Sequence, residues 1–546
     1  MITPLGLVLC FGSLLLPTHA AGVVDLGYAK YRGTTVHDAI SNTNNTQFLG
    51  IRYAASPTGN LRFSAPQPPA FIPGITVADT DPPSCLQAGF GLAPVTPFRG
   101  LNASDPHIGG AISSRQLIDR QSAAATEDCL FLNVFVPGNL GDKKNLPVVF
   151  WIHGGGYILG SATGFNGGDL IREAGGNVVA VVIQYRLGAF GFLAGQKVKE
   201  GGALNAGILD QQFALQWVRK NIRKFGGDPN KVTIWGESAG AGSVLQHVIA
   251  NGGRTSPPLF RAAITSSLYV PPQYKFNDPI SEAIFNKFAS LSGCSNAANT
   301  IACLKRADVN TLQNANEAVN RLGFFGTFVF SPVVDGTFIR DRPSAVLATG
   351  KFNGKMLLAV TNTFEGANFV DQSTAPTVQV AEYAQNLFPE MTPAQAQAAA
   401  QQYAGTGTNI AQAIGIMGEG IFICPTYNLL KAFNGHAFKS EFAIPPANHG
   451  DDVAYYFPNG NTPKFANPAF NKAFPQSFLN FAMALNTNAK FDPANITPFW
   501  PEFDGSNEML FNKTVAGAPD IRVIETDDAL LSRCNFWESV SAATAQ

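Results

Sequence analysis

Charged residues are scarce in this chain of 546 residues. Lys, Arg, Asp and Glu together make up 14% of the sequence, against roughly 25% in ordinary soluble domains. The charges of the 37 basic and 38 acidic residues nearly cancel. The chain therefore lacks the excess of basic residues that is typical of a protein that binds nucleic acid or an anionic membrane. Internal repeats and low-complexity linkers are absent too, and residues 21–546 are therefore predicted to form one large domain.

Membrane-spanning runs and metal-ligand spacings are also missing beyond the N-terminus. No later stretch approaches the ~20 apolar residues of a membrane helix. The segment FWESVSAATAQ has no apolar tail of the GPI type, and no pair of cysteines has the spacing of zinc ligands. These absences predict a protein without a transmembrane anchor and without a bound metal.

The N-terminal segment sets the expected compartment. LGLVLCFGSLLLP is apolar over about a dozen residues and THA follows it, a pattern typical of a secretory signal peptide cleaved after Ala20. We therefore predict that residues 1–20 are a signal peptide and that the protein is secreted and extracellular. Four sequons are then candidate glycosylation sites, at Asn44, Asn102, Asn495 and Asn512.

Cysteine usage fits an oxidising compartment. Removal of Cys10 with the signal peptide leaves six of the seven cysteines. An even count in a secreted chain predicts disulfides, although six cysteines allow 15 pairings. The six are Cys85, Cys129, Cys294, Cys303, Cys424 and Cys534.

Apolar residues are abundant, and their order along the chain favours an α/β architecture. Phe alone occurs 42 times, which indicates a large core. The runs LPVVFWIHGGGY and VVAVVIQYRLGAFGFL lack clean alternation, as do strands buried on both faces of a mainly parallel sheet. The helix-like DQQFALQWVRKNIRKFGGDP then leads to the strand KVTIW, a sharp turn and another helix-like segment, the order expected of an open α/β sheet.

The sharp turn carries a candidate nucleophile. In VTIWGESAGAGSV, Ser238 stands between Gly236 and Gly240, after a strand and before a helix, which is the context of a nucleophile elbow. Such a turn forces the serine backbone into a strained conformation, and the glycines leave room for neighbouring chains. At the N-terminus of a helix, the Ser238 hydroxyl would meet a partial positive charge that favours a developing anion.

A glycine-rich loop supplies the second expected part of such a site. HGGGY, residues 153–157, follows the strand VVFWI. Consecutive glycines let backbone N–H groups turn toward one point, as an oxyanion hole requires; a flexible loop is the alternative interpretation. We interpret His153 as a residue packed under the loop and not as a catalytic base.

With these motifs the chain resembles the type-B carboxylesterase/lipase family, which includes cholinesterases, and in pattern it is most similar to secreted fungal lipases and esterases. The segments that carry the resemblance are FLGIRYAASPTGNLRFSAPQPP, EDCLFLNVFVP, NAGILDQQFALQWVRKNI, FGGDPNKVTIWGESAGAGSV and SPVVDGTFI. The resemblance implies an α/β-hydrolase fold, with a mostly parallel central sheet flanked by helices and an elaborated cap or lid. It also implies no cofactor, and oxyanion donors at the N–H groups of Gly155, Gly156 and Ala239.

The catalytic base must follow the nucleophile, since the chain order in this fold is Ser, acid, His. His449, in ANHGDDVAYYF, resembles the catalytic histidine segment of the family. His436 is the alternative. His247 lies on the helix after the elbow and is interpreted as a packing residue.

The acid is predicted from a Glu-Gly pair that the family places after a strand. KMLLAVTNTFEGANF supplies Glu365, although Phe364 stands where the family has an acidic residue. Asp451 and Asp452 are the alternative partners of the histidine. Glu237 is expected beside the pocket, and Ser267 matches a supporting serine of the family, with Leu268 in place of the Gly that follows it there.

The resemblance further implies three disulfides and a loop over the site. The pairs are Cys85–Cys129, Cys294–Cys303 and Cys424–Cys534, the last as in cholinesterases. The loop closed by the first pair has no Trp, so a cation–π site for choline is missing there. The loop contains Phe90, Phe98 and an amphipathic run from Ile112 to Ile118. These residues could contact an apolar substrate or a lipid–water interface.

These features together predict a secreted serine carboxylic ester hydrolase, a lipase or esterase. It would cleave hydrophobic esters of medium or long acyl chains through an acyl-enzyme and a Ser–His–Glu triad. Phe324, Phe325, Phe328 and Phe330 are candidates for an acyl pocket, with core packing as the alternative. A short-chain or hydroxycinnamate-type esterase, a serine peptidase and a non-catalytic binding protein on the same fold are the other functions considered.

Overall fold

The computed structural model describes residues 22–101 and 125–546. The predicted signal peptide, the sequon at Asn102 and the run from Ile112 to Ile118 lie outside these described residues.

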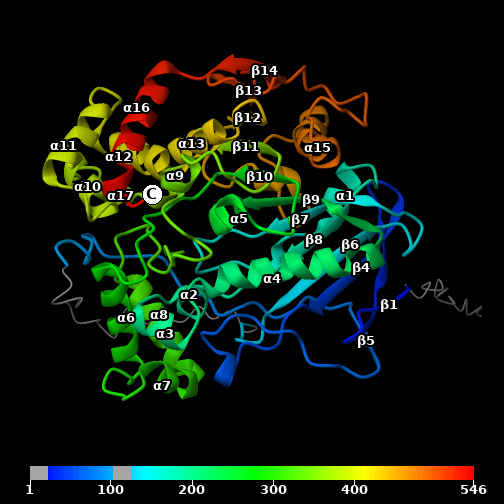
Figure 1. Cartoon of the computed structure of the whole chain (residues 1–546). Helices are drawn as coiled ribbons and strands as arrows, with labels where there is room; N and C mark the ends of the chain where they lie inside the picture. The colour runs from blue at the N-terminus through cyan, green and yellow to red at the C-terminus, as the bar shows by residue number, and fades with distance from the viewer. Residues whose placement is uncertain (1–21, 102–124) are drawn as a thin grey trace, which may run out of the picture.

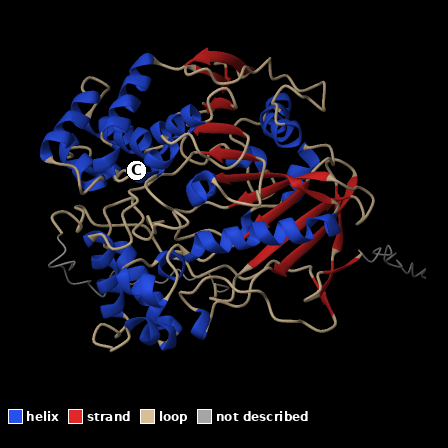
Figure 2. Cartoon of the chain, viewed as in Figure 1, coloured by secondary structure: helices blue, strands red, loops and turns tan. Residues whose placement is uncertain are grey.

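An 11-stranded sheet runs through the molecule (Figures 1 and 2). Its central strands, from β8 through β7 to β13, pair in parallel, while the strands beyond them pair antiparallel. In spatial order the strands are β14 (Pro519–Glu525), β13 (Asn507–Lys513), β12 (Ala437–Phe442), β11 (Met356–Asn362), β10 (Ala262–Ser266), β9 (Gly227–Glu237), β7 (Leu146–Ile152), β8 (Val179–Ile183), β6 (Phe131–Pro137), β4 (Thr43–Arg52) and β3 (Thr34–Asp38). A separate three-stranded sheet contains β1 (Val23–Asp25), β2 (Lys30–Arg32) and β5 (Ile75–Val77).

The central strands are apolar on both faces, as their uninterrupted hydrophobic runs predict. In β7, Val148, Phe150 and Ile152 belong to one core cluster, whereas Val149 and Trp151 belong to another on the opposite face. Alternate side chains of a strand point to opposite faces of the sheet. Both faces of the sheet are therefore apolar, and helices must pack against each of them. Helices α4 (Ala206–Asn221), α5 (Ala239–Gly253) and α13 (Cys424–Ala432) cover the first face, and α1 (Gly167–Glu173), α14 (Val453–Tyr456) and α15 (Pro468–Ala484) cover the second.

The predicted helix before the elbow ends where its glycines indicate. Helix α4 continues into a 3-10 turn that stops at Gly226, whose φ of 86° is in the left-handed region that favours glycine. The chain then enters β9, which contains the predicted strand KVTIW. Because β9 leads directly into Ser238 and α5, the end of α4 determines where β9 begins and so where Ser238 lies.

Two groups of helices lie together on one side of the sheet, at the left in Figure 1. The first group contains α2 (Gly188–Phe192), α3 (Gln196–Gly201), α6 (Pro279–Leu291), α7 (Thr300–Arg306) and α8 (Val309–Arg321). The second contains α9 (Pro343–Leu347), α10 (Val380–Leu387), α11 (Pro393–Gln402), α12 (Asn409–Gly418), the π-helix η7 (Glu419–Ile423), α16 (Asp528–Ser539) and α17 (Ser541–Thr544). Both groups contribute side chains to the apolar pocket described below.

One helical run departs from the sequence expectation. By length and composition, Asn409–Ala432 is sufficient to cross a membrane, whereas the sequence analysis found no such stretch after the N-terminus. This run comprises α12, η7 and α13, and 72% of its apolar window is buried inside the fold. Its hydrophobicity is that of a core helix, since α13 packs against β11 and β12.

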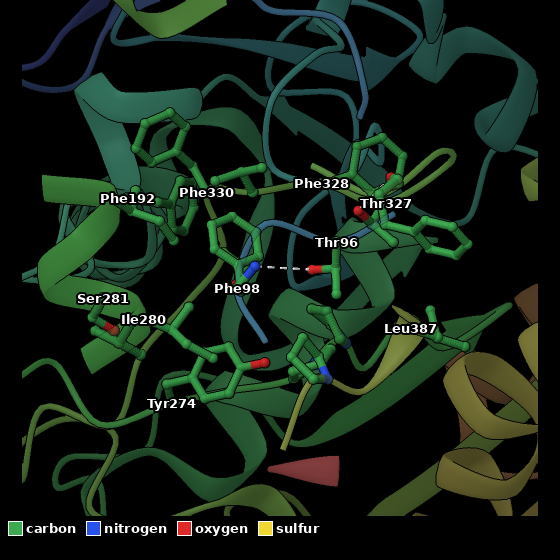
Figure 3. A pocket seen from close by; sticks show the side chains of 18 of the residues that line it. Thr96, Phe98, Phe192, Tyr274, Ile280, Ser281, Thr327, Phe328, Phe330 and Leu387 are labelled. Atoms are coloured by element: carbon green, nitrogen blue, oxygen red, sulfur yellow. Dashed lines mark hydrogen bonds between the residues drawn. The ribbon is translucent and has the colours of Figure 1, made fainter. Parts of the chain in front are cut away.

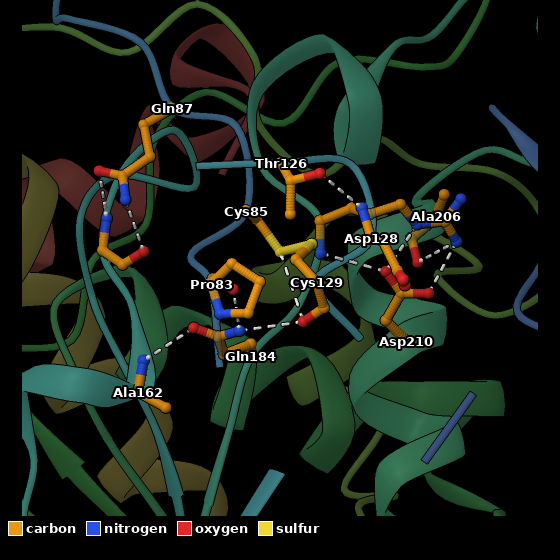
Figure 4. Close-up of a disulfide and its surroundings, with 12 residues drawn as sticks. Pro83, Cys85, Gln87, Thr126, Asp128, Cys129, Ala162, Gln184, Ala206 and Asp210 are labelled. Atoms are coloured by element: carbon orange, nitrogen blue, oxygen red, sulfur yellow. Dashed lines mark hydrogen bonds and ion pairs between the residues drawn. A yellow bond between two sulfur atoms is a disulfide. The ribbon is translucent and has the colours of Figure 1, made fainter. Parts of the chain in front are cut away.

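Three disulfides join the six cysteines of the described residues in the pairs that the family resemblance implies. The Cys85–Cys129 bond lies beside Gln184, at the end of β8 (Figure 4). Beside it, the Gln184 side chain donates hydrogen bonds to the carbonyl oxygens of Pro83 and Cys129. The segments around Cys85 and Cys129 are therefore joined to each other covalently and to the end of β8 by hydrogen bonds.

The Cys424–Cys534 bond should stabilise the fold more than the Cys294–Cys303 bond. The first spans 110 residues and the second spans 9, and a chain-entropy model assigns on the order of 4–5 kcal/mol to the longer loop and about 3 kcal/mol to the shorter one. Chemical denaturation of Cys424→Ala/Cys534→Ala and Cys294→Ala/Cys303→Ala double variants measures the difference. Equal losses in unfolding free energy would contradict it.

Candidate active site

The turn at Ser238 has the strained backbone that the elbow motif predicts. Ser238 has φ 57° and ψ −124°, between the end of β9 and the start of α5. A Cβ added at Gly236 would lie 2.4 Å from the backbone of Gly240, and one added at Gly240 would lie 2.0 Å from the carbonyl oxygen of Ile152. A side chain at Gly236 would collide with the start of α5, and one at Gly240 would push the turn away from β7. The serine N–H donates to the Ser266 carbonyl at 2.9 Å, which ties the turn to β10.

The structure brings His449 and Glu365 together, although 84 residues separate them in the chain. His449 Nδ1 lies 2.6 Å from Glu365 Oε2, and the carboxylate is fully buried. Glu365 follows β11 and His449 follows β12, and these neighbouring strands run parallel. Because the carboxyl ends of parallel strands meet at one edge of the sheet, both residues arrive at the edge where β9 ends in Ser238.

Further hydrogen bonds hold the acid in place. Glu365 Oε1 accepts a hydrogen bond from the Asn362 N–H at 2.7 Å. The Asn362 side chain donates to Ser267 Oγ at 2.9 Å and to Asp452 Oδ1 at 3.1 Å. Ser267, the supporting serine that the resemblance implies, is thus linked to Glu365 through Asn362. Asn362 was not identified from the sequence. Its position as a polar residue at the end of the apolar strand β11 is the only feature of the sequence that could have indicated a role.

The structure places the alternative bases away from Glu365. His436 is exposed and precedes β12, at the opposite edge of the sheet. His247 is buried in α5 with Nε2 3.1 Å from Gln211 Oε1, and burial lowers its pKa to about 3. His153 stacks on Tyr185 under the glycine loop, with ring centroids 4.5 Å apart, and burial lowers its pKa to about 4.

The alternative acids likewise have other partners. Asp451 accepts hydrogen bonds from Lys464 Nζ at 2.7 Å and from the Asn448 N–H at 2.9 Å. Asp452 accepts from Asn362, and burial raises its pKa to about 6. Among the described residues, Glu365 is therefore the carboxylate that holds the Nδ1 side of His449.

Glu237 occupies the other side of the imidazole. Its Oε1 lies 3.3 Å from His449 Nε2, on the side of the ring that faces the elbow. Burial raises the pKa of Glu237 to about 7. Burial also disfavours a charged His449, but the hydrogen bond to Glu365 and the charges of Glu365, Glu237 and Asp452 outweigh it and raise the pKa of the imidazole.

The glycine loop packs directly against the nucleophile. A Cβ added at Gly154 would lie 2.9 Å from Ser238 Cβ. Gly155 and Gly156 have φ values of 101° and 60°, which turn the backbone sharply above β7. The N–H of Ala239 begins α5 and has no partner within the helix. The three expected donors thus lie on the two segments that meet at Ser238.

A narrow apolar pocket with a volume of about 80 Å³ adjoins this site at Tyr269, whose N–H donates to the Ser238 carbonyl. Figure 3 shows residues that line the pocket. Phe324, Phe328 and Phe330 line it, whereas Phe325 lines a different hollow and contacts Phe90 with ring centroids 5.7 Å apart. Phe98, from the disulfide-closed loop, also lines the pocket.

Phe328 forms the boundary between the pocket and the oxyanion loop. A Cβ added at Gly156 would lie 2.4 Å from the Phe328 ring. Phe328 and Phe422 both contact Tyr269, and the Phe422 ring centroid lies 4.5 Å from that of His449. One layer of aromatic rings therefore connects the pocket to the imidazole.

Comparison with known proteins identifies the family. The chain matches the model of the carboxylesterase family over residues 20–537. It belongs to this family. The predicted resemblance is thereby confirmed, and the chain is a carboxylic ester hydrolase, the enzyme class that the sequence predicts.

Several relatives of this family are fungal. The chain is 32% identical to a secreted lipase of Arthroderma benhamiae, over 77% of this chain and 84% of that protein. It is 31% identical to carboxylesterase patB of Aspergillus clavatus, over 96% and 98% of the two chains. Its alignment with secreted lipase 1 of Botryotinia fuckeliana, at 35% identity, spans only 60% of that protein. The crystal structure of Aspergillus niger EstA superposes with a TM-score of 0.81 at 28% identity, covering 96% of this chain and 99% of that one.

Glu237→Gln should shift the acid limb of the pH–activity profile to lower pH. A general base must be neutral to accept a proton, and the Glu237 charge raises the pKa of His449. Loss of this charge lowers that pKa, so the neutral imidazole persists to lower pH. The measurement is kcat/KM for a p-nitrophenyl ester against pH.

A matched control is Glu441→Gln, which removes a carboxylate on β12 that accepts a hydrogen bond from Thr363. It should leave the acid limb in place. If the acid limb of the pH–activity profile of Glu237→Gln were unchanged or displaced to higher pH, the charge of Glu237 would not raise the pKa of His449 as stated.

Proposed function

We propose that this protein is a secreted serine esterase that hydrolyses hydrophobic esters through a triad of Ser238, His449 and Glu365. The observation that carries the proposal is the 2.6 Å contact between His449 and Glu365 at the edge of the sheet where the strained Ser238 turn lies. A nucleophile, a base and a buried acid at one site are the parts of nucleophilic ester hydrolysis.

The reaction follows from these positions. Ser238 Oγ attacks the ester carbonyl carbon while His449 Nε2 takes the hydroxyl proton, and the resulting oxyanion is held by the N–H groups of Gly155, Gly156 and Ala239. The imidazolium returns the proton to the leaving alcohol as the C–O bond breaks. Water then attacks the acyl-enzyme along the same path and releases the acid. Glu365 stays ionised and stabilises the imidazolium.

The apolar pocket supports a preference for medium or long acyl chains. Apolar residues of α6 and α12 and the Phe324–Phe330 segment line it, and burial of an acyl CH₂ group contributes about 0.8 kcal/mol. Phe90, Leu92 and Val95 at the start of the loop are 40–48% exposed, which supports contact with a lipid–water interface.

A short-chain esterase is the second candidate. Phe328 favours it, because its ring stands against Gly156 between the oxyanion loop and the pocket. A ring at this position limits the length of the acyl group that fits beside Ser238. The two candidates differ in one measurable quantity, the dependence of kcat/KM on acyl length.

Secretion is supported by the three disulfides and by relatives that are named as secreted.

Asn44 is exposed and Asn512 is half-buried, and both stay candidate glycosylation sites. Asn495 does not fit this role, since it is 4% exposed and its amide nitrogen points to Ala473 O and Gln476 Oε1. A glycan there would displace the packing of α15.

Ser238→Ala and His449→Ala should each abolish turnover of p-nitrophenyl esters. The remaining rate should not exceed the 10³–10⁴-fold acceleration over water that oxyanion donors and binding supply. His436→Ala is the matched control and should retain the parent rate. Full activity in His449→Ala would refute the triad, and faster cleavage of a peptide than of any ester would identify a peptidase.

Phe328→Ala should raise kcat/KM for p-nitrophenyl decanoate relative to p-nitrophenyl butyrate, by on the order of tenfold. Removal of the ring opens the pocket to the longer chain. Phe325→Ala, which lies outside this pocket, should leave the ratio unchanged. Parallel changes on both esters in Phe328→Ala would show that the pocket does not receive the acyl chain.

A further inference from the structure

Gln546 has a buried side chain that bridges two segments of the active-site wall. It follows α17 and is only 7% exposed. Its backbone N–H donates to the Ser541 carbonyl at 3.1 Å, and its own carbonyl oxygen accepts a hydrogen bond from Ser344 Oγ. The preceding residue, Ala545, accepts a hydrogen bond from the Gln273 N–H at 2.7 Å. These bonds fix the position from which the side chain reaches inward.

The amide nitrogen of Gln546 satisfies two carbonyl groups from distant parts of the chain. Nε2 donates to the Val270 carbonyl at 2.6 Å and to the Gly420 carbonyl at 2.8 Å. A third bond joins the same two segments, since the Val270 N–H donates to Ile421 O at 3.0 Å. Both hydrogens of one amide group are thus used to hold the Val270 segment against η7.

Each of these two segments touches the proposed catalytic groups. Tyr269, next to Val270, donates its N–H to the Ser238 carbonyl at 3.4 Å and lines the apolar pocket. On η7, Ile421 lines the same pocket and the Phe422 ring lies 4.5 Å from the His449 ring, centroid to centroid. The Tyr269 and Phe422 rings contact each other at 5.5 Å.

The π-helical form of η7 explains why a side chain is needed here. A π-helical turn interrupts the regular i to i−4 bonding of the helices around it. A buried carbonyl without a hydrogen-bond partner destabilises the fold, and Gln546 supplies a donor to Gly420 at this point. The same amide also donates to Val270, so it holds both η7 and the segment that contains Tyr269, together with the backbone bond from Val270 to Ile421.

We propose that Gln546 is a positioning residue for the acyl side of the active site. Its two hydrogen bonds set the spacing of Tyr269, Ile421 and Phe422, and thereby the width of the apolar pocket beside Ser238 and His449. This inference rests on the proposed function, because it assigns the pocket to the acyl group. Gln546 itself touches none of the three triad residues.

The test uses two variants that keep the size of the side chain and remove the donors, Gln546→Met and Gln546→Glu. In both, the ratio of kcat/KM for p-nitrophenyl decanoate to that for p-nitrophenyl butyrate should fall by on the order of tenfold, mainly through KM for the longer ester. Thermal unfolding by circular dichroism and titration of the reactive serine report the folded fraction, to which each rate is normalised. If Gln546→Met does not fold, Gln546→Glu decides.

The matched control is Ser344→Ala, which removes a hydrogen bond to the same residue but leaves both Nε2 bonds in place. It should lower the unfolding temperature and keep the parent ratio. A parent-like ratio in the Gln546 variants, or an equal fall in Ser344→Ala, would show a structural role alone and overturn the proposal. If the parent protein hydrolysed neither ester, the proposed function itself would fail, which is a distinct result.

Discussion

The close approach of three backbone segments beneath Ser238 is the constraint on which the site depends. Gly154, Gly236 and Gly240 each lie where a Cβ would come within 3 Å of a neighbouring segment. This contact lets the turn hold φ 57° at a serine, a conformation that costs on the order of 1–3 kcal/mol. Because β9 pairs with β7 on one side and with β10 on the other up to the turn, the surrounding sheet supplies that energy, and Ser238, the glycine loop and the start of α5 are fixed relative to one another.

The second constraint is electrostatic. Glu237, Glu365 and Asp452 are buried around a single imidazole, and each raises the pKa of His449. Burial of a carboxylate costs several kcal/mol unless hydrogen bonds and an opposite charge compensate it. Glu365 receives a backbone N–H from Asn362, Asp452 receives the side chain of the same residue, and Glu237 has the imidazole. The site thus favours the protonated form of His449, the form that the proposed mechanism requires when Ser238 attacks the ester.

The aromatic wall connects this polar centre to the apolar pocket. Phe422 and Phe369 pack on the His449 ring, with centroids 4.5 and 5.0 Å away, and Phe328 packs on Phe369. Rings in such contact exclude water from one side of the imidazole, which strengthens its hydrogen bond to Glu365. The apolar pocket and His449 therefore share a wall, so a change in the position of one ring affects both the pocket and the environment of His449.

The sequence by itself determined the parts of this protein whose causes are local. The elbow could be predicted because strand, glycines and helix are contiguous around Ser238, and the buried parallel sheet could be predicted because its strands are apolar on both faces. The family resemblance named His449 and Glu365, but their contact, the burial of Asn495 and the bridge made by Gln546 were decided by the tertiary structure. Each of these depends on segments that are far apart in the chain. For His449 and Glu365, the parallel register of β11 and β12 brings together two residues separated by 84 positions, and no local pattern of residues encodes that register.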